Sequence, residues 1–391
     1  MMRHVDAITG LRDAVTAAVR RTPAEGVRLD QAAGRWLAAP VRAARPAPST
    51  TCSAMDGYAV RAQDTEGPAP LSVRATLFAG QTASQALAPG EAARIYTGAP
   101  LPPGADSVVR SEAAREVDGR VAFSTPARPG ENVRRAGEDV AAGGLALPRG
   151  VRLGARQRAL LRAVGAEVVE VHRRPRVRIL STGDEIASGQ TPDSNGLAVA
   201  GACERAGAEV SVARVADVRA ELRAALAGAP AAADLVITVG GVSVGLKDLV
   251  PEVLGELGAE VRIHGVPMKP GKPFLFALLG GAPVLGLPGS PSACLVAFEV
   301  FARPALLAAS GAARLTRPEI VARLAEPVAG RAGRARLLWA ALEPDGRVRP
   351  VGRDAAQVRG PALADALLHL PAGTGELPEG AEVRAWVLGE D

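Results

Sequence analysis

A glycine-rich stretch at residues 240–248 has the composition best suited to bind an anion. It follows an apolar, β-branched run, Leu235 to Val239, and leads into a helical pattern that begins with Lys247 and Asp248. Its small residues are Gly240, Gly241, Ser243 and Gly245. Glycines let the backbone approach a ligand closely, and the first N–H groups of a helix attract negative charge. The stretch therefore predicts a phosphate or oxyanion site, with a plain strand–helix turn as the alternative.

Charged residues also follow the other strands predicted between residues 176 and 290. They are Asp184, Glu185, Asp217, Asp248, Lys269 and Lys272. Ligands of an open α/β sheet bind at the carboxyl ends of its strands, so four carboxylates and two lysines are expected along one edge. Carboxylate oxygens together with a phosphate suit Mg²⁺, and lysines suit phosphate as point charges. A structural alternative stays open for Asp184 and Asp217, because each could instead cap the helix that follows it.

The elements that position these residues follow from the hydrophobic pattern. Between residues 176 and 310 strands alternate with helices, which predicts a parallel, doubly wound α/β sheet. Short strands over 51–136 predict a small all-β unit. Strands return after residue 311, with one short helix around 362–368, and predict a C-terminal β-rich domain. A first amphipathic helix over 6–20, with Asp6 as its N-cap, is too short to be stable alone and needs a distant partner.

Composition restricts the classes of partner. The 391 residues are 48% hydrophobic and 22% charged, which indicates a globular chain. A net charge of +5 favours anionic ligands, but only 3% of residues are aromatic, so the stacking surfaces of single-strand nucleic-acid binders are missing. No apolar run approaches the roughly 20 residues of a membrane helix and no signal segment begins the chain, so we expect a cytoplasmic protein with no membrane partner. Three scattered cysteines and four histidines without paired spacing argue against a disulfide framework or a zinc site.

Eight short motifs occur in an order that resembles one known family. They are SAMDGYAV, TGAPLPPGADSVV, NVRRAGEDV, STGDE, DSN, GGVSVGLKD, KPGKP and GLPGSP. This set resembles the MoeA family, the molybdopterin molybdenumtransferases that also form the E domain of gephyrin. The resemblance implies an elongated homodimer of four-domain subunits, with β-rich domains around a central three-layer α/β domain similar in fold to the molybdopterin adenylyltransferases. It implies domains at 1–22 with 173–312, 23–50 with 137–172, 51–136, and 313–391.

The resemblance also implies a reaction and its residues. The reaction is insertion of molybdate into the dithiolene of adenylylated molybdopterin, with release of AMP and dependence on Mg²⁺. The implied catalytic residues are Asp56, Thr97, Asp139, Glu185, Asp217 and Asp248, of which Glu185, Asp217 and Asp248 would bind the metal. The implied substrate-binding residues are Gly240, Gly241, Ser243, Gly245, Lys269, Lys272, Pro288, Ser290 and Pro291. In the family the cleft lies between subunits, so Asp56 and Thr97 are expected from the partner chain, and the adenylyltransferase that supplies the substrate is a further expected partner.

Some positions depart from the family pattern. Ser290 stands where GLPGNP is usual, and the segment from Glu185 to Asp193 is short. The C-terminal run QVRGPALADALLHLP lacks the usual serine, which leaves open the part that the tail takes in ligand binding. Two other functions are kept as alternatives: nucleotidyl transfer onto molybdopterin, against which SAMDGYAV argues, and a partner-binding scaffold, against which the intact carboxylates argue. Tungstate stays open as the oxyanion because its charge and size match those of molybdate.

Overall fold

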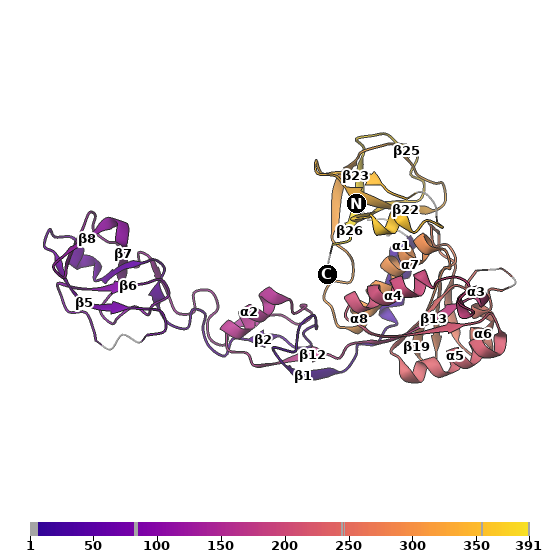
Figure 1. The fold of residues 1–391 in the computed structure, drawn as a ribbon, viewed down its shortest axis with the longest axis horizontal. Coiled ribbons are helices and arrows are strands. Elements are labelled where there is room, and N and C mark those ends of the chain that lie inside the picture. The colour runs from indigo at the N-terminus through magenta and orange to yellow at the C-terminus, as the bar shows by residue number, and fades with distance from the viewer. Residues whose placement is uncertain (1–6, 82–84, 244, 246, 353–354, 390–391) are drawn as a thin grey trace.

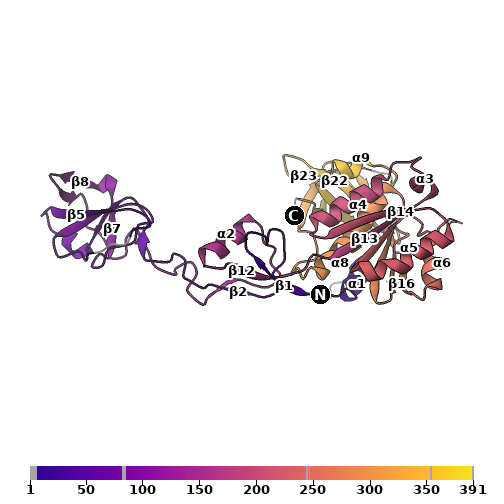
Figure 2. The same ribbon diagram turned by 60° about the horizontal axis from the view of Figure 1, so that its bottom comes forward.

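The computed structural model describes residues 7–81, 85–243, 245, 247–352 and 355–389. Its overall shape is elongated (Figure 1), with an all-β unit at one end and an α/β domain plus a C-terminal β domain at the other. A small linking unit lies between them, and the turned view in Figure 2 shows the same arrangement. The predicted multidomain α/β fold with β-rich domains is therefore confirmed.

The central domain contains a six-stranded sheet in the order β14-β13-β15-β19-β18-β16. Its strands are β13 (Arg176–Thr182), β14 (Glu209–Val215), β15 (Leu235–Val239), β16 (Glu260–His264), β18 (Leu275–Leu279) and β19 (Ala282–Leu287). Strands β14, β13, β15 and β19 are parallel, whereas β18 is antiparallel to both β19 and β16. The sheet is thus mixed rather than wholly parallel, because the hairpin turn at Gly280 and Gly281 reverses the chain between β18 and β19.

Helices cover both faces of this sheet. One face carries α1 (Ala7–Ala17), α4 (Ser194–Arg205), α7 (Pro291–Ala297), the π-helical segment η3 (Phe298–Ala302) and α8 (Arg303–Ala309). The other face carries α5 (Arg219–Ala232) and α6 (Val250–Glu256), as Figure 2 shows. Adjacent residues of β13 alternate between these faces, so Ile179 belongs to the first core and Leu180 to the second. Helix α1 packs on α8 and η3 through Ile8 and Val15, which supplies the distant partner it needs; Asp6 lies outside the described residues.

The continuous helix Pro291–Ala309 contradicts one expectation from the sequence. It has 19 residues and a mean hydropathy of 1.6, so its length and composition alone would allow it to cross a membrane. The expectation that no apolar run approaches this length is therefore wrong. Within the fold, 83% of its apolar window is buried, and side chains such as Phe298 and Phe301 pack in the core beneath the sheet. Its apolar composition is explained by that core position.

The linking unit and the all-β unit are built from short strands. The linking unit contains β1 (Ala24–Arg28), β2 (Val41–Arg42), β11 (Leu145–Leu147), α2 (Ala155–Ala163) and β12 (Val168–His172), with β1 paired to β12 and β2 to β11. The all-β unit contains β3 (Cys52–Ser53), β4 (Gly57–Val60), η1 (Ala62–Thr65), β5 (Leu71–Leu77), β6 (Glu91–Ile95), β7 (Ser107–Arg110), η2 (Ser111–Ala113), β8 (Ala114–Val117), β9 (Arg120–Phe123) and β10 (Val133–Arg134). Its main sheet has the order β7-β4-β6-β5-β9-β8, which confirms the all-β prediction for residues 51–136.

The C-terminal domain is a closed five-stranded barrel. It contains β20 (Glu319–Leu324), β21 (Val328–Ala329), β22 (Ala335–Leu342), β23 (Arg347–Pro350), α9 (Arg359–Ala362), β24 (Ala366–Leu370), β25 (Glu376–Leu377) and β26 (Glu382–Val387). Strands β22, β23, β20, β26 and β24 pair in that order, and β24 returns to β22. The short strand β17 (Met268–Lys269) of the central domain joins the barrel by pairing in parallel with β22.

The helix predicted around residues 362–368 is wrong. Helix α9 ends at Ala362, and residues 366–370 form strand β24. Three consecutive apolar residues in this strand are buried because it is covered on both sides: Leu367 packs in the central core, whereas Ala366 and Leu368 pack inside the barrel. A strand buried on both faces loses the apolar–polar alternation by which it would be recognised in the sequence.

Candidate active site

Two pockets lie on opposite sides of the turn that joins β19 to α7. Gly289 and Pro291 line one pocket, of about 270 Å³, which we call the strand-end pocket. Pro288 and Ser290 line the other, of about 260 Å³, which we call the basic pocket. Consecutive residues of the GLPGSP motif thus face different pockets, so the turn forms the wall between them.

The strand-end pocket lies where β13 and β15 end. Its described lining residues are Ser181, Thr182, Glu185, Ile186, Thr191, Pro192, Asp193, Ser194, Asn195, Val239, Gly240, Gly289 and Pro291. Asp193 caps α4 by accepting the Gly196 N–H at 2.8 Å, and the Asn195 side chain donates to the Gly289 carbonyl at 2.7 Å. Ser181 is 1% exposed and its hydroxyl has no hydrogen-bond partner among the described atoms. Strand β13 lies between β14 and β15, so the chain passes from β13 to β14 on one side and then returns to β15 on the other. Open α/β sheets bind ligands at such a reversal of the strand order.

Gly240 and Gly241 must be glycines in this conformation. Their φ angles are +88° and +67°. A Cβ on Gly241 would lie 2.9 Å from the Thr182 hydroxyl oxygen, so a side chain there would push against β13 as well as strain the backbone. The sequence therefore needs both glycines to bring the loop close to the end of β13.

Asp184 precedes Glu185, which lines this pocket, and its carboxylate accepts hydrogen bonds from Asp217 and Lys247; we call Asp184 and Asp217 the acidic rim. The Asp184 carboxylate accepts the Asp217 N–H at 2.9 Å and the Lys247 ammonium at 2.8 Å. The Lys247 bond, followed by the Asp217 N–H, holds the pKa of Asp184 below its ordinary value. Burial, followed by the charges of Asp184 and Glu185, raises the pKa of Asp217. The rim thus carries more negative charge than Lys247 neutralises.

The capping alternative for Asp184 and Asp217 is wrong. Helix α5 begins at Arg219, and its N-cap is Val218, which makes no side-chain bond. The short helix α3 (Asp184–Ala187) starts at Asp184 itself and is capped by Gly183. Asp184 instead bridges two other elements, and this bridge was missed in the sequence because its two partners are remote from it along the chain.

The glycine loop differs from its predicted form near Asp248. Helix α6 begins at Val250 rather than at Lys247, and it has seven residues. The Asp248 carboxylate accepts the Gly245 N–H at 2.7 Å. An anion at the loop would compete with Asp248 for this amide, which precedes helix α6, and the anion site at the loop stays a prediction. Ser243 is exposed on the same loop.

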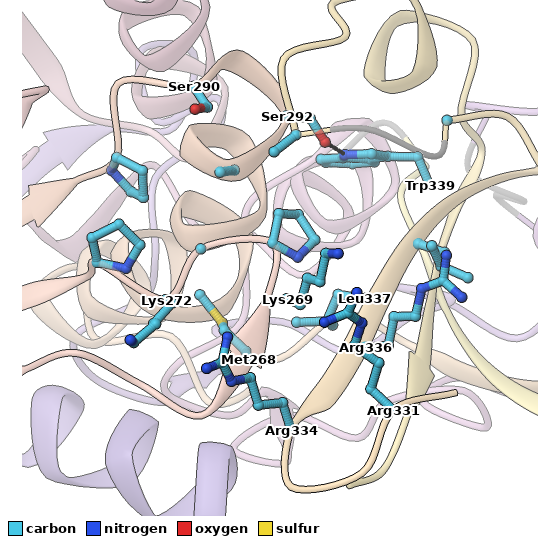
Figure 3. Close-up of a pocket in the computed structure, with 18 residues that line it drawn as sticks. Met268, Lys269, Lys272, Ser290, Ser292, Arg331, Arg334, Arg336, Leu337 and Trp339 are labelled. Carbon is cyan, nitrogen blue, oxygen red and sulfur yellow. Dashed lines mark hydrogen bonds between the residues drawn. The ribbon is translucent and has the colours of Figure 1, made fainter. Parts of the chain in front are cut away.

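The basic pocket gathers cationic side chains from two domains (Figure 3). Lys269 and Lys272 belong to the central domain, and the barrel adds Arg331, Arg334 and Arg336. Parallel pairing of β17 with β22 sets Lys269 opposite Arg336. None of the described residues that line the pocket is Asp or Glu. The pocket therefore offers an anion several positive charges with little competition from within its own lining.

A buried hydrogen bond fixes the barrel beside this pocket. The Trp339 indole N–H donates to the Ser292 hydroxyl at 2.9 Å, as Figure 3 shows. Trp339 is 5% exposed and packs in the core of the central domain. The barrel arginines were not predicted as site residues; the run RAGRAR at 331–336 was the available signal, but only the pairing with β17 identifies the site it joins.

Asp56 and Thr97 meet at the far end of the molecule. One Asp56 carboxylate oxygen accepts the Thr97 N–H and hydroxyl, each at 2.7 Å, and these bonds lower the Asp56 pKa. Asp56 therefore connects two separate segments of the all-β unit and does not bond only within its own turn. Asp139 lies on the segment that connects the all-β unit to the linking unit, where its N–H donates to the Ala47 carbonyl. Within one chain the all-β unit lies remote from the central sheet, so Asp56 does not reach the strand-end pocket of its own chain (Figure 1).

Comparison with known proteins identifies the family. The MoeA N-terminal region (domain I and II) matches residues 5–165, the probable molybdopterin binding domain matches 178–308, and the MoeA C-terminal region (domain IV) matches 321–388. A molybdopterin molybdenumtransferase of Nostoc sp. is 42% identical over 313 residues, 76% of this chain and 72% of that protein. Molybdopterin molybdenumtransferase 2 of Mycobacterium tuberculosis is 37% identical over 382 residues, 93% of this chain and 94% of that protein. The chain belongs to the MoeA family of enzymes.

A solved structure agrees with this assignment. The molybdopterin biosynthesis MoeA protein from Pyrococcus horikoshii OT3 superposes with a TM-score of 0.84 and 25% sequence identity, covering 98% of this chain and 100% of that one. Membership of the MoeA family makes this chain a transferase of molybdenum cofactor biosynthesis. The resemblance drawn from the eight motifs is confirmed.

The carboxylates of this MoeA chain have the donor chemistry that Mg²⁺ requires. Among the described residues, no group of three or more His, Cys, Asp or Glu side chains is arranged to hold a metal ion. Mg²⁺ usually keeps several waters and binds one or two carboxylates together with substrate phosphates, so a preformed group of three is not needed. The pKa of Asp217 is raised by burial and then by the charges of Asp184 and Glu185, and a cation would offset the part that is due to these charges. Binding by Glu185, Asp217 and Asp248 stays a prediction.

Proposed function

We propose that the chain inserts molybdate into the dithiolene of adenylylated molybdopterin, releasing AMP, in a Mg²⁺-dependent reaction in the cytoplasm. The observation that supports this most directly is the basic pocket beside the strand-end pocket. Molybdate and the phosphates of the nucleotide are anions, and five cationic side chains line the basic pocket. Glu185 lines the strand-end pocket on the other side of the β19–α7 turn, so anionic substrate groups and a hard cation both have side chains suited to them.

The residues of the chain have distinct parts in this reaction. Lys269, Lys272 and the barrel arginines bind the oxyanion and phosphate groups and hold them in place. Glu185, Asp217 and Asp248 are the carboxylates that would hold Mg²⁺, which when bound would offset charge building on the AMP phosphate as the phosphoanhydride breaks. The Asp184 carboxylate accepts the Asp217 N–H, which fixes the Asp217 backbone and so orients the Asp217 carboxylate.

The proposal includes a homodimer. Asp56 and Thr97 lie on a unit that is remote from the strand-end pocket of the same chain. A second chain that brings its all-β unit to this pocket would complete the site with an Asp56 carboxylate already kept ionised by Thr97. In a two-fold dimer each chain would complete the site of the other.

An assay with the purified protein tests the proposed function. We expect the wild-type chain, given adenylylated molybdopterin, molybdate and Mg²⁺, to release AMP and form the cofactor, and Asp248→Ala to lose this activity while remaining folded. The exposed carboxylate Glu260 of the same domain provides a matched control, since Glu260→Ala removes an equal charge outside both pockets. Parallel reactions with tungstate identify the preferred oxyanion.

Co-expression then asks whether the site is shared. Mixed dimers of Asp56→Ala and Asp248→Ala chains contain one intact site if the two residues meet across the interface, so about a quarter of wild-type activity returns. Undiminished AMP release by Asp248→Ala contradicts the proposed mechanism. Adenylylation of molybdopterin with ATP instead would indicate nucleotidyl transfer, and absence of both activities would leave a partner-binding scaffold.

A further inference from the structure

Two aromatic rings stack at the edge of the all-β unit. Phe78 follows the last residue of β5 and Tyr96 follows the last residue of β6. Their ring centroids lie 4.8 Å apart with an interplanar angle of 9°. The Tyr96 N–H donates to the Leu77 carbonyl at 3.1 Å, so the parallel pairing of the strands continues to the rings. The stack is therefore held by the ends of the two strands.

Phe78 is unusual among the aromatic residues of this chain. All of the aromatic residues lie in the described part of the chain, and Phe78 is the exposed one, with 48% of its surface accessible. Leu77 and Ile95, which precede the two rings, are buried in the core of the unit. Tyr96 stacks on one face of the Phe78 ring, and nearly half of the Phe78 surface stays accessible beside this stack. Aromatic rings pair favourably in stacked arrangements, so an exposed ring of this kind can stack on a flat ring of a ligand.

The stack lies beside the Asp56–Thr97 pair. Thr97 follows Tyr96 directly and donates twice to Asp56. A Cβ on Gly98, the residue after Thr97, would lie 3.7 Å from the Cβ of Ala79, the residue after Phe78. The segment after Phe78 therefore packs against the turn that carries Thr97. The Phe78 N–H donates to the Gln81 side chain at 3.0 Å, which fixes the start of that segment. The two rings and the candidate catalytic carboxylate thus belong to one continuous surface.

We infer that Phe78 and Tyr96 form an aromatic platform that stacks a heteroaromatic ring of the substrate next to Asp56. This inference rests on the proposed function, because adenylylated molybdopterin carries two such rings, the pterin and the adenine. The shared chemistry is a flat, polarisable ring held face to face on Phe78. The platform positions the substrate and takes no part in bond making, so its loss affects substrate binding more than turnover.

Steady-state kinetics test the platform. Phe78→Ala is expected to raise the KM for adenylylated molybdopterin about 5- to 30-fold, with kcat nearly unchanged. Phe78→Trp is expected to restore the wild-type KM, whereas Phe78→Leu, which is apolar but has no aromatic face, is not. Val117→Ala provides the matched control, because Val117 is an exposed apolar residue of the same unit. Thermal unfolding of each variant separates lost stacking from lost folding.

Equilibrium binding with two probes identifies the ring. AMP and free pterin are each bound to wild-type protein and to the Phe78 variants, and the probe that stacks on Phe78 loses affinity in Phe78→Ala and recovers it in Phe78→Trp. Unchanged affinity for both probes together with an unchanged KM overturns the platform. Binding is measured without turnover, so a wild-type chain that releases no AMP counts against the proposed function while the binding results still decide the platform.

Discussion

The strand-end pocket and the basic pocket share one wall but are built in different ways. The strand-end pocket is formed within the central domain, from the ends of β13 and β15 and the loop after α3. The basic pocket needs two domains, because β17 of the central sheet region pairs with β22 of the barrel. Glu185 lines the strand-end pocket next to the acidic rim, whereas five cationic side chains line the basic pocket.

The two pockets therefore depend on different parts of the fold. The strand-end pocket depends on the glycine turn and on hydrogen bonds such as Asn195 to Gly289, all local to one sheet. The basic pocket depends on the position of a whole domain. Damage to the barrel should therefore remove the basic pocket and leave the strand-end pocket intact, whereas a local charge change should affect one pocket and leave the fold intact.

Truncation of Trp339 should have the largest effect. Trp339→Ala removes a buried indole that anchors the barrel on the central core and loses the bond to Ser292. We expect a loss of about 3–5 kcal/mol in the free energy of unfolding, measured by urea titration, together with weaker binding of AMP. Trp386→Ala on β26 is the control, because Trp386 is only half-buried and should cost less. Equal losses for the two variants would contradict the idea that Trp339 anchors the barrel.

Reversing one charge in the basic pocket should have the next largest effect. Lys269→Glu places a carboxylate opposite Arg336, so we expect kcat/KM for adenylylated molybdopterin to fall about 100-fold, about 2.7 kcal/mol, with an unchanged unfolding temperature. Arg323→Glu changes the net charge equally on an exposed part of the barrel outside the pocket and serves as the control. A similar fall for both variants would mean that the overall charge of the protein, rather than the pocket, attracts the substrate.

The two pockets also differ in how far the sequence predicts them. The rule that ligands bind at strand ends predicted a common edge for Glu185, Asp217 and Gly240, since alternating strands and helices determine which ends meet. The same rule predicted Lys269 and Lys272 on that edge, whereas they line the basic pocket on the other side of the β19–α7 turn, and their binding of an anion stays a prediction. It could not identify Arg331, Arg334 or Arg336, because they follow no strand of the central sheet and reach the pocket only through pairing between domains.

The fold shows the same limit. Periodicity predicted the central strands and the all-β unit because each has one buried face or a regular βα alternation. It failed at Ala366–Leu370, where the barrel and the central core bury both faces of one strand. It also placed the start of α6 too early, because Lys247 and Asp248 favour a helix locally but are engaged by Asp184 and by the Gly245 N–H. Tertiary contacts between separate segments decided each of these cases.

Asp217 should give the smallest effect and the clearest test of the acidic rim. Its pKa is raised in the folded chain, mainly by burial, so its contribution to stability is present below the unfolded pKa and is lost as pH rises through the folded pKa. We therefore expect Asp217→Asn to raise the unfolding temperature by about 1–3 °C at pH 7 and to give no gain in acid. Asp184→Asn is the matched control, because it should shift the unfolding temperature in the opposite direction. The pKa of Asp184 is lowered, chiefly by Lys247, so its stabilisation is present above the unfolded pKa and is lost as pH falls. Asp184→Asn should lower the unfolding temperature at pH 7, and the difference should shrink in acid. If calorimetry across this pH range shows both variants shifting in the same direction, the rim does not carry the unbalanced negative charge that distinguishes it from the basic pocket.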